Sequence, residues 1–133
     1  MSPTAIIPAG AEEACAELAL SPGILSAEHL FVTGMTASDA SGTMPEDAAT
    51  QFHNAFGKIG LVLTEAGLDF SSIVEMTSYH IGIRNHFDLF NEVRRHYVHA
   101  PFPAWTAVGV AELRRPGALV EIRVIAHKLQ PRA

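Results

Sequence analysis

The sequence predicts an α+β fold, in which a mixed β-sheet carries two helices on one of its faces. Apolar residues recur at helical spacing between residues 45 and 66. Segments such as 30–34 and 119–127 are short and rich in β-branched or aromatic residues, which is typical of strands. These patterns alternate along the chain in the order β-β-α-β-α-β-β, which favours helices packed on a single sheet. The 133 residues are enough for one core, so we expect one domain spanning 1–133.

The first two strands are expected to form a hairpin. Strand 21–26 opens at Ser-Pro-Gly, the chain turns at Glu28 and His29, and the second strand covers 30–34. A loop of small and polar residues follows at 37–43. The hairpin therefore precedes the first helix.

Two helices follow with recognisable ends. The first begins at Pro45, a residue that a first helical turn tolerates, and Gly67 ends it. After a strand at 72–81, Asn85 is the expected cap of the second helix, which ends before Pro101.

The last two strands, 104–111 and 119–127, are expected to form a second hairpin around a turn at 114–117, where Pro and Gly occur together. Strand 104–111 is apolar on both faces, whereas the last strand places Glu121 and Arg123 opposite its apolar face. With both helices on one side, the other sheet face would be bare. We therefore expect a closed homo-oligomer that packs through its sheets and forms clefts between subunits.

Composition excludes several classes of partner. The net charge of −5 argues against a nucleic-acid surface, and no apolar run is long enough for a membrane span. The N-terminus lacks a basic-then-apolar signal, and the lone Cys15 fits a reducing compartment, so a cytoplasmic protein is expected. Only 17% of residues are charged, which again favours a surface covered by other subunits.

Several short segments in register resemble the Rid (reactive intermediate deaminase) family, also called the YjgF or L-PSP family. The segments are Leu30–Gly34, Ala66-Gly67, Asp88–Val93, Pro103–Thr106 and Val120–Ile122. The resemblance implies a chorismate-mutase-like homotrimer with three clefts between subunits. It also implies hydrolysis of enamine or imine intermediates to ketones with release of ammonia.

The resemblance carries over the functional residues only in part. Deaminating members have an Arg that holds the substrate carboxylate where this chain has Trp105. In the resemblance, members of the YjgH-like branch also have Trp at this position. They typically also have Tyr, Ser, Gln and often Cys at four further positions, which here are Leu20, Thr33, Met35 and Ala107. The acid of the last strand, Glu121, and the helix residue Asn91 are retained.

The exchange of Arg for Trp105 alters what the cleft can bind. Arg holds a carboxylate through two charge-assisted hydrogen bonds, whereas Trp offers one neutral N–H. A 2-imino acid should therefore bind poorly unless another cation takes over, and Arg123 and Arg84 are the candidates. Alternatively, Trp105 stacks on a flat uncharged ligand, or it only fills the cleft or the trimer core.

Other candidate residues have a structural alternative as well. Glu121 could activate a water as general base or acid, or form an interfacial salt bridge with Arg123. Thr33 and Asn91 could hydrogen-bond a ligand, or satisfy strand ends and helix turns. His80 is the histidine expected nearest the cleft.

No cofactor and no metal are expected. His96 and His99 are three residues apart near a helix end, but no acidic or cysteine partner lies at metal-site spacing. Three functions remain open: an imine or enamine deaminase, a trimer that binds a small metabolite without turnover, and an endoribonuclease. The acidic composition disfavours the third.

Overall fold

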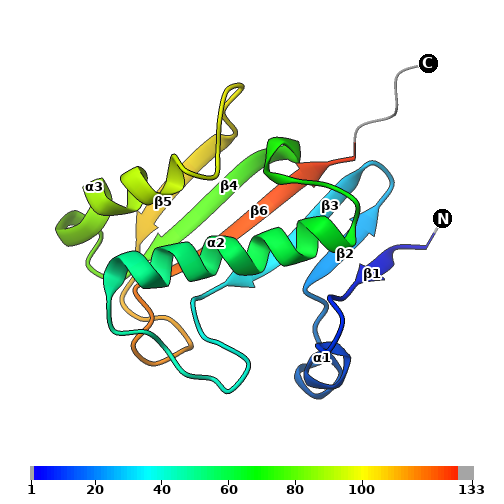
Figure 1. The fold of residues 1–133 in the computed structure, drawn as a ribbon, viewed down its shortest axis with the longest axis horizontal. Coiled ribbons are helices and arrows are strands. Elements are labelled where there is room, and N and C mark those ends of the chain that lie inside the picture. Colours follow the sequence, from blue (N-terminus) through cyan, green and yellow to red (C-terminus); the bar gives the residue numbers. More distant parts are fainter. Residues whose placement is uncertain (1, 129–133) are drawn as a thin grey trace.

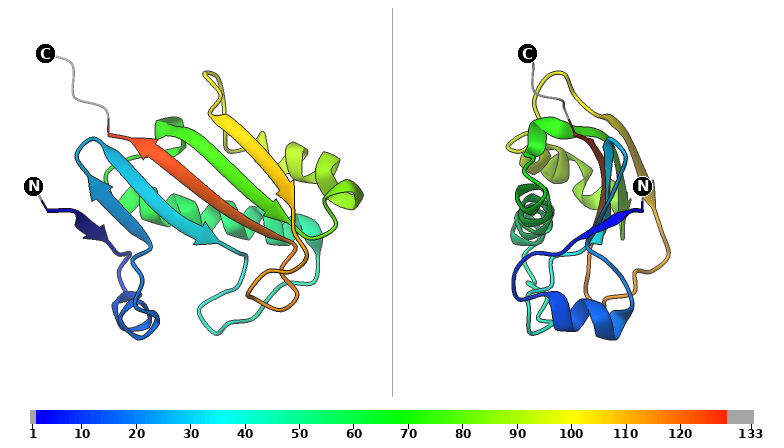
Figure 2. Two further views of the ribbon diagram at one scale, coloured as in Figure 1. Left: turned by 180° about the vertical axis from the view of Figure 1, so that it is seen from behind. Right: turned by 90° about the vertical axis from the view of Figure 1, so that its right-hand side faces the viewer.

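A mixed six-stranded sheet forms the centre of the molecule in the computed structural model, which describes residues 2–128 (Figure 1). Its strands are β1 (Thr4–Ile6), β2 (Gly23–Ser26), β3 (His29–Met35), β4 (Ile73–His80), β5 (Ala104–Gly109) and β6 (Val120–His127). The helices are α1 (Glu12–Leu18), α2 (Ala48–Glu65) and α3 (Ile83–Arg94), and a short 3-10 helix, η1, spans Phe70–Ser72. Helices α2 and α3 lie on one face of the sheet, while α1 lies beyond one end of the strands (Figure 2).

The predicted α+β fold and the order of its main elements are confirmed, with β1 and α1 added before them. The strands lie in the order β1-β2-β3-β6-β4-β5. Strands β2 and β3 form the predicted hairpin. Strand β6 is antiparallel to both β3 and β4, and β4 is parallel to β5.

The predicted hairpin between the last two strands is wrong. Strand β5 pairs with β4 at the sheet edge, and β6 lies between β3 and β4. The segment 110–119 is therefore a crossing connection and not a tight turn. The physical reason is burial: alternate residues of β6 from Val120 to Ala126 are all buried, so the centre of the sheet is the favoured place for this strand.

The predicted start of each helix also needs correction. Helix α2 begins at Ala48 rather than Pro45, because the carboxylate of Asp47 accepts the backbone N–H of Thr50 at 2.9 Å and caps the helix there. Asn85 does not cap α3. Gly82 is the N-cap, with a φ of +66° that glycine adopts without steric cost, and Asn85 lies in the first turn.

The core lies between α2, α3 and the sheet. Its largest buried side chains come from both helices and from the inward positions of the strands, and they include Phe52, Phe56, Phe90, Leu30 and Ile122. The opposite sheet face has no helix over it (Figure 2). Phe31, Val74 and Val108 are 41%, 45% and 37% exposed. A single chain therefore leaves apolar sheet surface in water.

Candidate functional site

The predicted site residues divide between the two faces of the sheet. Trp105 lies on the helix-covered face, since its ring contacts Phe87 and Phe90 of α3. Glu121 and Arg123 lie on the bare face, because the residues that alternate with them in β6 are buried beneath the helices. The two groups are thus separated by the thickness of the sheet.

The ring of Trp105 is fixed by contacts with three side chains of the same chain. It stacks on Phe87 at 5.5 Å between centroids with an interplanar angle of 5°. The guanidinium carbon of Arg94 lies 3.9 Å from the centroid of the indole, within the range of a cation–π interaction. The indole N–H donates to Ser78 Oγ at 2.9 Å. Trp105 therefore has no free N–H for a ligand in this arrangement.

Behind Trp105, a chain of hydrogen bonds leads into the core. Ser78 Oγ lies 2.8 Å from His80 Nε2, and His80 Nδ1 lies 3.2 Å from His86 Nε2. Ser78 and His80 are fully buried. A neutral imidazole has one donor and one acceptor nitrogen, so neutral His80 can form a hydrogen bond to each of these neighbours.

Burial agrees with this charge state of His80. Desolvation lowers the pKa of His80 to about 4, and the charge of His86 adds to the effect. Desolvation also lowers the pKa of His86. His80 has no exposed surface, and its ring nitrogens face Ser78 and His86.

Arg94 is a site neighbour that sequence reasoning missed. Its Nε and Nη2 atoms donate to Asn91 Oδ1 at 3.2 and 3.0 Å. The side-chain oxygen of Asn91 is thus engaged by Arg94. The spacing of three residues along a helix was the available signal, because such pairs lie on one face. Nothing in the sequence placed β5 beside that face.

On the bare face, Glu121 lies against the backbone of β3. A Cβ at Gly34 would overlap the carboxylate of Glu121, so glycine at this position leaves room for it. The pairing of β3 with β6 shifts register between Val32 and Met35, at this same place. Tyr79 of β4 pairs with Glu121 from the other side. Glu121 is half-buried among these neighbours.

The remaining candidates are placed less centrally. Thr33 is next to Gly34, and its hydroxyl donates to the carbonyl of Ser21 at 2.6 Å. Arg123 is exposed on the bare face. Arg84 is exposed in the first turn of α3 and lines a shallow depression with Gly82 and the end of β5.

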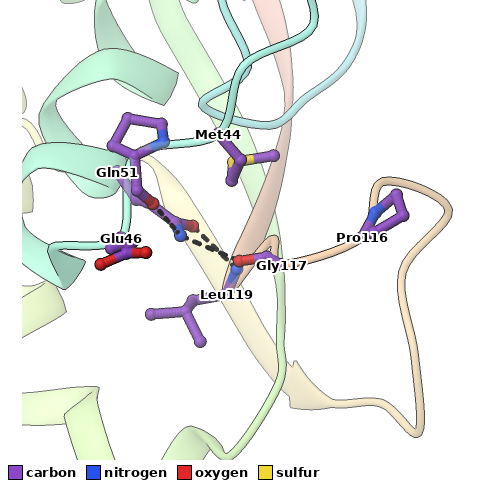
Figure 3. A pocket seen from close by; sticks show the side chains of 7 residues that line it. Met44, Glu46, Gln51, Pro116, Gly117 and Leu119 are labelled. Carbon is purple, nitrogen blue, oxygen red and sulfur yellow. Dashed lines mark hydrogen bonds between the residues drawn. The ribbon is translucent and has the colours of Figure 1, made fainter.

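A second depression lies at the start of α2 and is lined by Gln51 (Figure 3). Gln51 is buried, and its amide nitrogen donates to the carbonyls of Pro45 and Gly117 at 2.7 and 2.9 Å. Its oxygen accepts the N–H of Leu119 at 2.8 Å. These bonds tie the segment before α2 to the 110–119 connection. Gln51 therefore has a structural role, and both its amide nitrogen and its amide oxygen are engaged in hydrogen bonds within the chain.

Residues 2–128 offer neither a metal site nor a membrane-spanning helix. They contain no group of three His, Cys, Asp or Glu side chains placed to hold a metal ion. In the same range, no helix has both the length and the apolar character needed to cross a membrane.

The comparisons with known proteins identify the family. The model of the endoribonuclease L-PSP family matches residues 11–128, and the chain belongs to this family, which confirms the resemblance noted in the sequence. The RutC family protein YjgH of Escherichia coli K12 is 39% identical over 125 residues, which cover 93% of this chain and 94% of that protein. The solved structure of protein YJGH aligns with a TM-score of 0.88 at 36% sequence identity. The alignment covers 98% of this chain and 100% of the chain in that structure.

A relative that is named for an enzymatic activity is also similar to this chain. The 2-iminobutanoate/2-iminopropanoate deaminase of Bos taurus is 35% identical over 108 residues, which cover 80% of this chain and 77% of that protein. Both the YjgH-like and the deaminase relatives thus align over most of the chain.

Proposed function

We propose that this protein hydrolyses a small imine or enamine metabolite to a carbonyl compound and ammonia, at sites formed between the subunits of a homotrimer. The observation that carries the proposal is the placement of Glu121, a half-buried carboxylate on the bare sheet face, seated over a glycine. Membership of the family and the match to a bovine deaminase support the reaction class.

The need for several subunits follows from the position of the candidate residues. Trp105 and Asn91 lie on the helix side and Glu121 on the bare side, so the proposed site takes these residues from different chains. The exposed Phe31, Val74 and Val108 give the bare face a reason to pack against another copy. A second chain would then bring its helix-side residues to the rim of the first chain's sheet.

Glu121 has a defined part in the reaction. Water adds to the carbon of the C=N bond, with a proton passing to the carboxylate and from there to the nitrogen. Glu121 then passes the proton of the resulting hydroxyl group to the amine, the C–N bond breaks to release ammonia, and the hydroxyl oxygen becomes the carbonyl oxygen. Water and imine are the reactants, and ketone and ammonia are the products, so no cofactor is required. The hydroxyl of Thr33 is proposed to accept a hydrogen bond from the ligand.

Two measurements test this function together. Ammonia release from a panel of freshly generated imines and enamines should be catalysed by the wild-type protein, and native mass spectrometry should show a trimer. Replacing Glu121 with Gln removes the proton-transfer group with little change of shape, so turnover should fall sharply. Equal turnover by Glu121→Gln would contradict the mechanism.

The alternative is a trimer that binds a metabolite without turning it over, and the engaged N–H of Trp105 is the observation that favours it. Under this alternative, ligands bind at the same clefts while no imine in the panel releases ammonia. The family's description as an endoribonuclease does not carry over to this chain by itself, because its net charge of −5 disfavours a polyanion.

A further inference from the structure

Arg94 contacts two of the predicted site residues at once. Its guanidinium lies over the ring of Trp105 at 3.9 Å, and it donates two hydrogen bonds to the amide oxygen of Asn91. The guanidinium is thus in contact with the ring on one side and hydrogen-bonded to the amide through two of its nitrogens. A flexible side chain is thereby held in one orientation.

A guanidinium carries five N–H groups, so two hydrogen bonds leave three of its N–H groups available. The bonds to Asn91 use Nε and one hydrogen of Nη2. Every buried side-chain nitrogen and oxygen in the range 2–128 has a partner, and Arg94 Nη1 forms no side-chain hydrogen bond there. Nη1 therefore reaches the accessible surface, and its two N–H groups and the second hydrogen of Nη2 form no side-chain hydrogen bond within residues 2–128.

Within residues 2–128, the two side chains that Arg94 contacts do not offset its charge. Trp105 and Asn91 are neutral, and the side chain is only half-exposed. Desolvation lowers the pKa of Arg94, and repulsion from Arg95 adds to this. A carboxylate close by would act in the opposite direction. A partly dehydrated cation with N–H donors still available is suited to bind an anion.

The two cations favoured by the sequence are less well placed. Arg123 lies on the opposite face of the sheet from Trp105 and is exposed. Arg84 is exposed and lies about three helical turns before Arg94 along α3. Neither has the aromatic and amide contacts that orient Arg94.

We propose that Arg94 is the anion-binding residue of this site and that the ligand is a small organic carboxylate, such as a 2-imino or 2-oxo acid. The inference rests on the proposed function for the location of the site. The carboxylate accepts two parallel hydrogen bonds from Nη1 and Nη2, while Trp105 and Asn91 position the guanidinium. A carboxylate matches the two donors of one guanidinium edge, whereas a phosphate dianion needs further donors.

The test compares two ligands of similar size and shape, one with a carboxylate and one with a neutral amide in its place. The wild-type protein is titrated with 2-oxobutanoate and with the neutral 2-oxobutanamide, by calorimetry and by the fluorescence of Trp105, the only tryptophan in the chain. We expect the carboxylate to bind at least about tenfold more tightly, because a hydrogen bond to a charged group has this effect. Absent binding of 2-oxobutanoate, or equal binding of the two ligands, overturns the inference without any variant.

Substitution then assigns the effect to one residue. Arg94→Gln should weaken 2-oxobutanoate binding by about ten- to a hundredfold and leave the amide unchanged. Arg94→Lys keeps the charge but loses the fork, so its affinity should be intermediate. Arg95→Gln removes the same charge from the adjacent exposed position and should change binding by less than about threefold.

The outcomes separate this inference from the proposed deaminase function. Circular dichroism and native mass spectrometry first establish that each variant is folded. If Arg94→Gln does not fold, the comparison of the two ligands and the affinity of Arg94→Lys test the inference instead. Carboxylate binding that depends on Arg94, without ammonia release from any imine, supports the inference and refutes the deaminase. Ammonia release from a 2-imino acid that is unchanged in Arg94→Gln, or a loss of binding seen only in Arg123→Gln, overturns the inference.

Discussion

The two faces of the sheet differ in how much of each is covered and hydrogen-bonded within a single chain. On the helix-covered face, the polar atoms of Trp105, Ser78 and His80 are paired with one another. On the bare face, Glu121 and Tyr79 lie side by side with no helix over them (Figure 2). The helix-covered half of the candidate site is therefore arranged within one chain, whereas the proposed function requires a second copy to cover the other half.

The largest expected effect separates core from interface. Phe90→Ala removes a buried ring from the helix-covered face and should lower the free energy of unfolding by about 3–5 kcal/mol. Phe31→Ala, on the bare face, should leave the fold of the protomer intact and weaken its assembly. Urea denaturation and analytical ultracentrifugation of both variants measure the two effects. A Phe31→Ala protein that assembles like the wild type would break the comparison.

Activity should depend on the bare face. Glu121→Gln should reduce ammonia release by about 10²–10⁴-fold, the range for loss of a general acid or base. Gly34→Ala places a methyl group where the carboxylate of Glu121 lies, and the resulting displacement should cost up to about 10²-fold. Glu65→Gln, a change of an exposed acid in the last turn of α2, is the control and should retain activity. Full activity of Gly34→Ala would show that the position of Glu121 is unimportant.

Stability should fall on acidification because of the helix-covered face. The folded protein keeps His80 neutral down to its lowered pKa of about 4, whereas the unfolded chain protonates near 6.5. The unfolded state therefore binds more protons between these values, and the free energy of unfolding falls as pH drops from about 6.5 to 4, by up to about 1.4 kcal/mol per unit. His80→Gln should flatten this slope in urea titrations.

The exposed His29 provides the control for this pH dependence. His29→Asn should keep the slope of the wild type. A slope that is the same in all three proteins would mean that His80 is not the responsible group.

The smallest effect concerns a single bond on the helix-covered face. Trp105→Phe retains an aromatic ring against Phe87 but deletes the N–H that donates to Ser78. The unfolding free energy should drop by about 1 kcal/mol, the typical net value of a hydrogen bond. Circular dichroism during urea titration measures the change, and the oligomeric mass should stay constant. An unaltered midpoint would show that this bond adds no stability.

Local sequence patterns predicted the helices and strands better than they predicted which strands lie side by side in the sheet. The periodicity of α2 and the alternation in β6 are properties of contiguous residues, so both elements were predictable. Which strands pair is decided by burial over the whole sheet. The Pro116-Gly117 pair looked like a hairpin turn, yet the connection carries the chain across β4 to the centre of the sheet.

The candidate site was predictable in the same uneven way. Glu121 and Trp105 could be singled out from the strand pattern and the family resemblance. Arg94 could not, because its importance comes from the approach of β5 to α3, which no local pattern encodes. His80 was predicted beside a cleft, but the structure buries it behind Ser78.

The most direct test of the central claim is subunit complementation. Chains carrying Glu121→Gln and chains carrying Arg94→Gln, each expected to be nearly inactive, are mixed in equal amounts, unfolded and refolded together. If each site takes its helix side from one subunit and its Glu121 side from another, about a quarter of the sites regain both intact halves, and ammonia release should return to about a quarter of the wild-type value. Hybrids no more active than the parent variants would contradict a site shared between subunits.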